Sequence, residues 1–153
     1  MQILDIEGVR FTLKLTCDSV DRMAADPVMV GRYGKDADVS TITDEDSQIV
    51  VRLALDRRFI VAVGQAMLVD QSPEHVAAWN RAWNGETAEE ITKAVTDEVT
   101  AFFPPIARIG IRRALSQIQT TMENLNLSGQ SESNGGISPE LSGSNQGSSV
   151  SAN

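Results

Sequence analysis

Few residues of this sequence have types and spacings that could perform chemistry. Ser72 and His75 lie three positions apart and, together with an acid, would supply the residue types of a catalytic triad. Ser72 directly precedes Pro73 and Glu74, however, and this combination is typical of a helix start, where the serine hydroxyl caps the helix. No Gly-x-Ser-x-Gly motif is present. The pattern therefore predicts a capping serine and not a nucleophile.

Metal and thiol chemistry have equally little support. His75 is the only histidine and Cys17 the only cysteine, which excludes an intrachain disulfide and any zinc site with several His or Cys ligands. Asp44, Glu45 and Asp46 are consecutive, whereas a calcium loop needs oxygen ligands at alternate positions. We expect these acids in the first turn of a helix, at the positive end of its dipole. Cys17 is predicted to be a small buried side chain.

Two loop patterns also favour structural roles. Asp36 and Asp38 could form a carboxylate pair for acid–base chemistry, but two aspartates in a polar loop are predicted to be solvated. Gly31 and Gly34 lack the following Gly-Lys-Ser/Thr of a phosphate-binding loop. We therefore predict a protein that is not an enzyme, with no catalytic residue, no metal and no cofactor.

The large aromatic residues near the middle of the chain are the candidates for binding a protein partner. Trp79 and Trp83 are four positions apart and would share one face of a helix. They either pack in the core or form an exposed anchor, since tryptophan is enriched at binding hot spots. With Phe102 and Phe103, they make up the predicted partner-binding set.

Composition sets the class of protein. The chain has 153 residues, 13 Lys and Arg against 21 Asp and Glu, and a formal net charge of −8. This balance argues against binding to nucleic acid or to an anionic membrane surface. The longest apolar run, residues 59–69, is about half of the roughly 20 residues that a membrane span requires. The single cysteine and the absence of a secretory signal predict a soluble protein of the cytoplasm.

The composition changes near residue 125. Of the 28 residues at 126–153, nine are Ser, five Gly and four Asn, and only two carry a charge. Such a segment buries too little apolar surface to offset its ordering entropy. We therefore predict one folded domain over residues 1–125 and a disordered Ser/Gly/Asn-rich tail over 126–153.

Hydrophobic periodicity predicts an α+β fold that is mostly α. Alternating apolar residues around Gly8 predict a β-hairpin, which must pack on helices because a two-stranded hairpin is marginal alone. A bundle of about five helices is expected to follow, over 18–25, 44–69, 73–83, 88–103 and 106–125, with an irregular loop over 27–42. The segment 44–69 is either one helix or two, with a break near Gly64.

The periodicity also predicts which residues are buried. In the segment 44–69 the expected apolar stripe is Ile49, Leu53, Ile60, Val63 and Met67, with Arg52 and Asp56 paired on the solvent side. In the last helix the expected buried face is Ile106, Ile109, Ala114, Ile118 and Met122. Arginines line the other side of that helix.

The organisation of the chain resembles that of the tail assembly chaperones of long-tailed phages. The resemblance is carried by the hairpin of residues 3–15 with Gly8 at its turn, by the short helix 18–25 that includes Ser19–Met23, and by the helical bundle and polar C-terminus that follow. It implies a non-enzymatic role in virion morphogenesis, namely binding the apolar tape-measure protein, beside tail tube proteins, before the tail polymerises. Such chaperones are often also made in a frameshift-extended form.

Two other functions remain open at the level of sequence. A structural virion subunit, either a head–tail completion protein or a tube-associated protein, would use the same hairpin, helices and loose terminus. A small cytoplasmic adaptor is the third reading. Homo-oligomerisation fits each of them.

Overall fold

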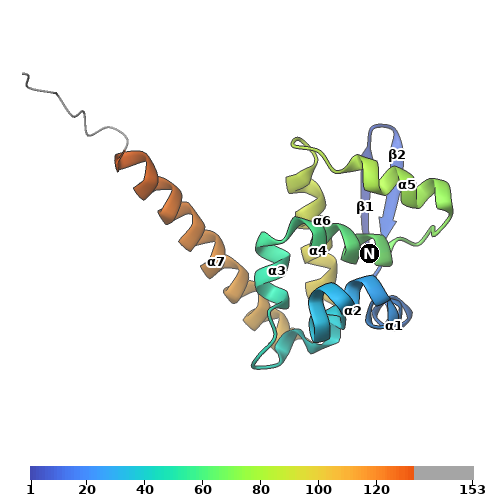
Figure 1. The fold of residues 1–153 in the computed structure, drawn as a ribbon, viewed down its shortest axis with the longest axis horizontal. Helices are drawn as coiled ribbons and strands as arrows, with labels where there is room; N and C mark the ends of the chain where they lie inside the picture. The colour runs from blue at the N-terminus through green and yellow to red at the C-terminus, as the bar shows by residue number, and fades with distance from the viewer. Residues whose placement is uncertain (133–153) are drawn as a thin grey trace, which may run out of the picture.

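The computed structural model describes the backbone of residues 1–132 and the side chains of residues 1–128 (Figure 1). The predicted class is confirmed: a two-stranded hairpin is followed by helices. The elements are β1 (Gln2–Ile6), β2 (Val9–Leu13), α1 (Cys17–Ala25), α2 (Pro27–Tyr33), the 3-10 helices η1 (Gly34–Ala37) and η2 (Val39–Thr43), α3 (Ile49–Leu55), α4 (Arg57–Met67), α5 (Pro73–Ala82), α6 (Ala88–Phe102) and α7 (Pro105–Glu132).

The hairpin forms as its alternating pattern predicts. Glu7 and Gly8 make the turn with positive φ angles of 51° and 81°, and glycine adopts this conformation without steric cost. The antiparallel register opposes Leu4 with Phe11. One face of the hairpin is fully buried and consists of Leu4, Ile6, Phe11 and Leu13.

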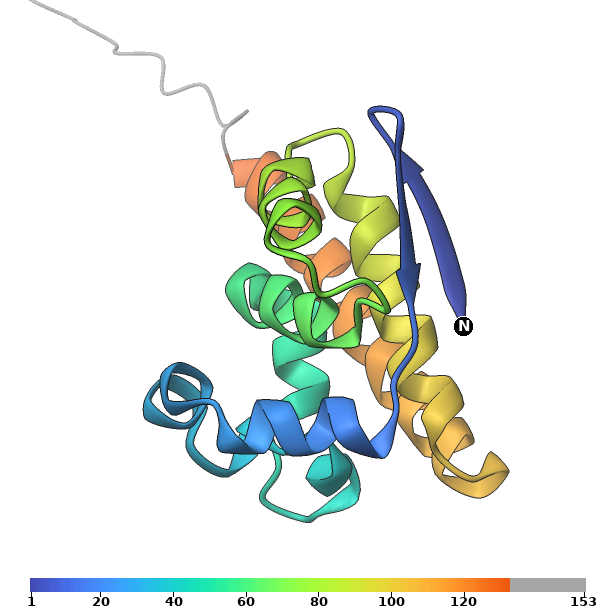
Figure 2. The same ribbon diagram turned by 90° about the vertical axis from the view of Figure 1, so that its right-hand side faces the viewer.

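The hairpin is attached to the helices by both packing and backbone hydrogen bonds. β1 packs against α6. Figure 2 shows the hairpin running alongside this helix. At the end of β2, the amide of Lys14 donates to the carbonyl of Met67 at 2.8 Å, and the amide of Val69 donates to the carbonyl of Thr12 at 2.9 Å. The hairpin therefore gains, from the end of α4, the support that two strands alone lack.

A single aspartate joins the first two helices. Asp26 ends α1 with an extended backbone, and its carboxylate accepts from the amides of Val28 and Met29 at the start of α2. Pro27 follows as the first residue of α2, a position where its missing N–H is no loss. The predicted irregular loop over 27–42 is therefore wrong, because Asp26 both ends α1 and caps α2, and Pro27 begins α2.

The predicted helix over 44–69 is two helices, and the break lies at Asp56, not near Gly64. Asp56 has φ −99° and ψ 96°, and its carboxylate accepts from the amides of Arg58 and Phe59 at 3.0 and 3.1 Å. A side chain that caps α4 therefore interrupts the helix. The predicted apolar stripe through both helices is confirmed as buried: Ile49, Leu53, Ile60, Val63 and Met67.

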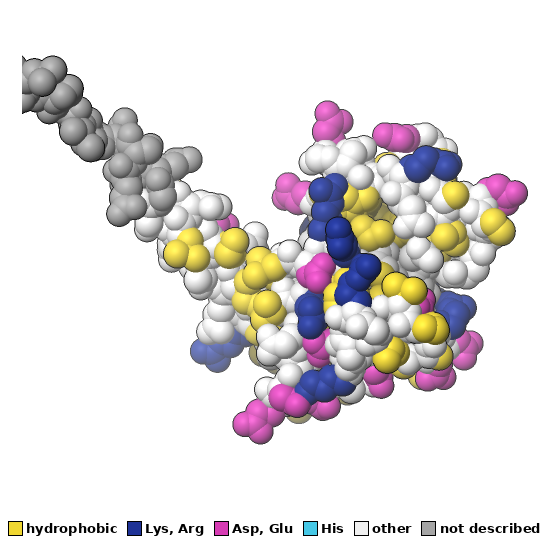
Figure 3. All heavy atoms as spheres, in the orientation of Figure 1, with side chains coloured by type: hydrophobic (Ala, Val, Ile, Leu, Met, Phe, Trp, Pro, Cys, Tyr) yellow, Lys and Arg dark blue, Asp and Glu magenta, His cyan; other side chains and the backbone are white. Residues whose placement is uncertain are grey.

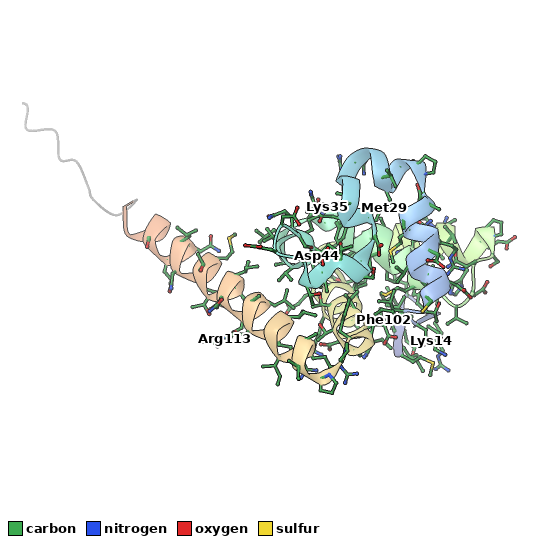
Figure 4. All side chains as sticks on the ribbon, turned by 90° about the horizontal axis from the view of Figure 1, so that it is seen from below. Lys14, Met29, Lys35, Asp44, Phe102 and Arg113 are labelled. Carbon is green, nitrogen blue, oxygen red and sulfur yellow. The ribbon has the colours of Figure 1, made fainter. Side chains whose placement is uncertain are left out.

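The acidic cluster Asp44–Asp46 does not begin a helix. α3 starts at Ile49, and the three acids occupy the exposed turn before it, where Asp46 forms an ion pair with Lys35. This ion pair and the accompanying hydrogen bond lower the pKa of Asp46. Figure 4 shows Lys35 and Asp44 on the same side of the molecule.

Asp36 is buried, in contrast to the predicted solvated side chain. It is 3 % exposed, and its carboxylate accepts from Arg52 Nε at 2.8 Å and from the amide of Gln48 at 3.2 Å. The Arg52 guanidinium also lies 5.0 Å from the centre of the Tyr33 ring. The predicted Arg52–Asp56 pair is present, but at 3.9 Å it is longer than the pair with Asp36.

The last helix extends beyond the predicted domain end and away from the body of the molecule (Figure 1). α7 continues to Glu132, past residue 125, and residues 133–153 of the predicted tail lie outside the described residues. Its predicted buried face is wrong at Ile106, Ile109 and Met122, which are 87 %, 69 % and 40 % exposed, whereas Ala114 and Ile118 are half-buried as predicted. The buried residue of this helix is Ile111, with Ala107 and Leu115 packed beside it. The apolar residues of this helix lie on more than one face, and contacts with the rest of the molecule determine which face is buried.

Candidate partner-binding groove

Trp79 lies in the core. It is 1 % exposed, its Nε1 donates to the carbonyl of Val61 at 3.0 Å, and its ring meets Phe11 edge-on at 5.4 Å. The prediction that Trp79 contacts a partner does not fit this position, because core packing accounts for the whole side chain.

Trp83 lies at the surface, directly after the end of α5. It is half-buried, and the Arg57 guanidinium lies 5.3 Å from the centre of its ring. Within the described part of the chain, its buried indole Nε1 has no acceptor. The two tryptophans therefore do not form one exposed face, because Trp79 lies within α5 and Trp83 beyond its end.

Phe102 and Phe103 lie at the C-terminal end of α6, where the chain turns into α7 (Figure 4), whereas Trp83 precedes the start of α6. Their rings are 5.4 Å apart in an edge contact; Phe102 is half-buried and Phe103 is 8 % exposed. The 15 residues of α6 correspond to roughly 20 Å of helix. The four predicted residues are therefore not brought together into one site.

The structure instead has an apolar groove where α3, α6 and α7 meet. It has a volume of about 710 Å³ and is lined by Leu53, Ala54, Leu55, Ala88, Glu89, Thr92, Lys93, Thr96, Asp97, Leu115, Ile118, Gln119 and Met122. The charged residues all belong to α6, where Lys93 and Asp97 pair with each other at 2.7 Å. The walls contributed by α3 and α7 carry no charge.

Apolar side chains continue from this groove onto the surface. Leu55 and Val51 of α3 are 52 % and 40 % exposed, and Met122, Leu125 and Leu127 of α7 are 40 %, 62 % and 67 % exposed. Figure 3 shows apolar surface on α7 and next to it. Exposed apolar side chains that gather around a hollow are typical of an interaction site. An amphipathic helix placed along α7 would cover them.

The sequence contained a signal for this groove. Val51 and Leu55 are apolar and four positions apart, but they lie outside the buried stripe of α3. A helix with a second apolar face has more apolar surface than one core can cover. The α7 wall had a partial signal, because Ile118 and Met122 belong to the apolar face predicted for that helix.

The Ser72–His75 pair forms no catalytic arrangement. Asp70 accepts from the amide of Ser72 at 2.9 Å, and His75 Nδ1 lies 3.8 Å from Asp70 Oδ2. Hydrogen bonds from the Ser72 backbone and side chain, with a smaller contribution from His75, lower the pKa of Asp70. Within residues 1–128, no hydrogen bond joins the Ser72 hydroxyl to His75. Ser72 is the N-cap residue of α5, but its side chain does not form the predicted capping hydrogen bond with that helix.

Cys17 is exposed as the first residue of α1, so the prediction of a buried thiol is wrong. Across the described residues, no group of three or more His, Cys, Asp or Glu side chains could hold a metal ion. Of the helices described, none is long and apolar enough to span a bilayer. Comparisons with protein-family models, curated proteins and solved structures found no match to this chain.

Proposed function

We propose that this protein is a non-enzymatic binding protein of phage tail assembly, which holds an apolar helix of the tape-measure protein before the tail forms. The observation that carries the proposal is the groove between α3, α6 and α7, with Leu55 and Met122 exposed at its edge. A partner helix in this groove would remove these side chains from water, and apolar burial is the main driving force of such association.

Two further features support the proposal. The hairpin, the short helix α1 and the helical bundle keep the order that carries the resemblance to tail assembly chaperones. The net charge of −8 would keep a protein with exposed apolar surface soluble. Tail tube proteins are the proposed secondary contacts, and the cytoplasm of the host is the proposed location.

The projecting end of α7 favours a second candidate, a structural virion subunit. Leu125 and Leu127 lie on this end, where a neighbouring copy in a ring could cover them. The two candidates differ in the fate of the protein. A chaperone is absent from finished particles, whereas a subunit remains in them at fixed stoichiometry.

The test is affinity copurification of the full chain from its native expression setting, combined with mass spectrometry of purified particles. The proposal predicts recovery of a very long helical protein and absence of the chain from the particles. Recovery of the chain alone, or of capsid and tube subunits that persist with it in particles, would contradict the chaperone and favour the subunit.

A further inference from the structure

The apolar groove continues across the surface into two smaller hollows. A hollow of about 220 Å³ shares Leu55 and Ala88 with the groove. A third hollow, of about 490 Å³, shares Arg57 and Trp83 with the second. The three hollows are therefore neighbours on one surface, with Trp83 between the last two, and we call this row of hollows the channel.

The third hollow is basic, in contrast to the first. Its lining includes Arg32 from the last turn of α2, and Arg57 and Arg58 from the first turn of α4. Within residues 1–128, no acidic side chain forms an ion pair with any of these three guanidinium groups. Figure 3 shows Lys and Arg side chains in a column on this face, beside apolar surface.

The position of Arg57 and Arg58 is electrostatically unfavourable within the fold. Cations in the first turn of a helix are opposed by the positive end of its dipole. The Asp56 carboxylate next to them caps α4 by accepting from the backbone amides of Arg58 and Phe59, and its charge offsets only part of this repulsion. The basic hollow thus holds three guanidinium groups without an ion pair in the described part of a chain whose net charge is −8.

We propose that this basic hollow binds carboxylates of the helix that occupies the apolar groove, so the partner segment has an apolar stripe with acidic residues at one end. The inference rests on the proposed function and adds the charge pattern of the partner. Arginine suits this role because its planar guanidinium binds carboxylates in a bidentate manner. Charge complementarity would also fix the direction in which the helix lies.

The channel favours a protein segment over a nucleic acid. Its larger part is apolar and offers nothing to a phosphate backbone, and the acidic chain as a whole repels polyanions. A protein helix with mixed apolar and acidic character matches both parts of the channel.

Photocrosslinking in the full chain tests this proposal. Leu55, in the apolar groove, or Asn80, which lines the basic hollow, is replaced by benzoylphenylalanine, and crosslinked peptides are sequenced after expression in the native setting. We expect the crosslink from position 55 to map to an apolar helical segment. The crosslink from position 80 should map to an acidic stretch adjoining that segment in the same protein.

Charge reversal supplies the second measurement. Arg32→Glu with Arg58→Glu should weaken binding of the captured protein about tenfold or more. The control is Arg112→Glu with Arg113→Glu, which makes the same change of charge at exposed residues of α7 that line none of the three hollows. Figure 4 shows Arg113 on the side of α7 that faces away from the body. This control should leave the affinity unchanged.

The outcomes separate the two proposals. No crosslink from position 55 to another protein would contradict the proposed function itself. A crosslink from position 55, with the one from position 80 falling outside any acidic stretch, would overturn the charge pattern alone. Crosslinks to this chain's own C-terminal residues or to a second copy would overturn the partner helix as occupant. Equal losses in both arginine pairs would overturn the role of the basic hollow.

Discussion

Gly64 lies directly against the indole ring of Trp79, in the middle of α4. A Cβ at position 64 would overlap the Trp79 ring and would lie 3.0 Å from Val95 Cγ2. α4, α5 and α6 therefore meet at a point where only a glycine fits. This contact explains why position 64 is a glycine, although glycine lowers helix propensity.

Gly64→Ala is expected to destabilise the protein by about 2–3 kcal/mol, because the added methyl group forces the buried indole or the helix to move. The measurement is urea unfolding followed by circular dichroism. Gly31→Ala is the control: Gly31 lies in α2 with nothing within 4 Å of its added Cβ, and the substitution should stabilise by about 0.5–1 kcal/mol. Equal effects at the two positions would contradict the close contact with Trp79.

The buried Asp36–Arg52 pair is expected to hold η1 against α3. Asp36→Ala should cost about 3 kcal/mol, because it removes the carboxylate that binds Arg52 and leaves the partly buried guanidinium without its main partner. Asp46→Asn breaks the exposed pair with Lys35 and should have little effect on the same unfolding curve, because solvent screens that pair. A loss no larger than that of Asp46→Asn would show that Asp36 is not a structural anchor.

Acid sensitivity should involve Asp70. Because its pKa is lowered in the folded state, Asp70 stabilises the fold above its unfolded pKa of about 3.9, and this contribution is lost as the pH falls through the lower folded value. The melting temperature of Asp70→Asn should therefore fall less steeply than that of the natural chain below about pH 4. Parallel curves would contradict the hydrogen bonds that Asp70 accepts from Ser72.

Most of the fold could be predicted from local pattern. The alternation around Gly8 predicted the hairpin, and the stripe from Ile49 to Met67 predicted the core faces of α3 and α4. Two errors in the helix bounds arose where one residue decides the break. Asp26 both ends α1 and caps α2, and Asp56 caps a helix inside an otherwise continuous apolar stripe.

The binding site could be predicted far less well. Large aromatic residues indicated partner binding, but Trp79 fills the core, and the surface depends on which face of α7 meets the body. That choice is made by Ile111 and Leu115 packing against the core, and the sequence periodicity allows both phases. The groove is therefore a property of the tertiary structure that helix patterns alone do not specify.

The most direct test of the groove compares exposed apolar residues inside and outside it. Leu55→Glu and Met122→Glu place a charge in the groove, whereas Ile109→Glu places one on exposed apolar surface of α7 outside it. Each variant is copurified from the native expression setting, and the captured partner is quantified against the natural chain at equal thermal stability. Binding of a partner helix in the groove predicts that both groove variants lose most of the partner while Ile109→Glu retains it. Full retention by Leu55→Glu and Met122→Glu would contradict it.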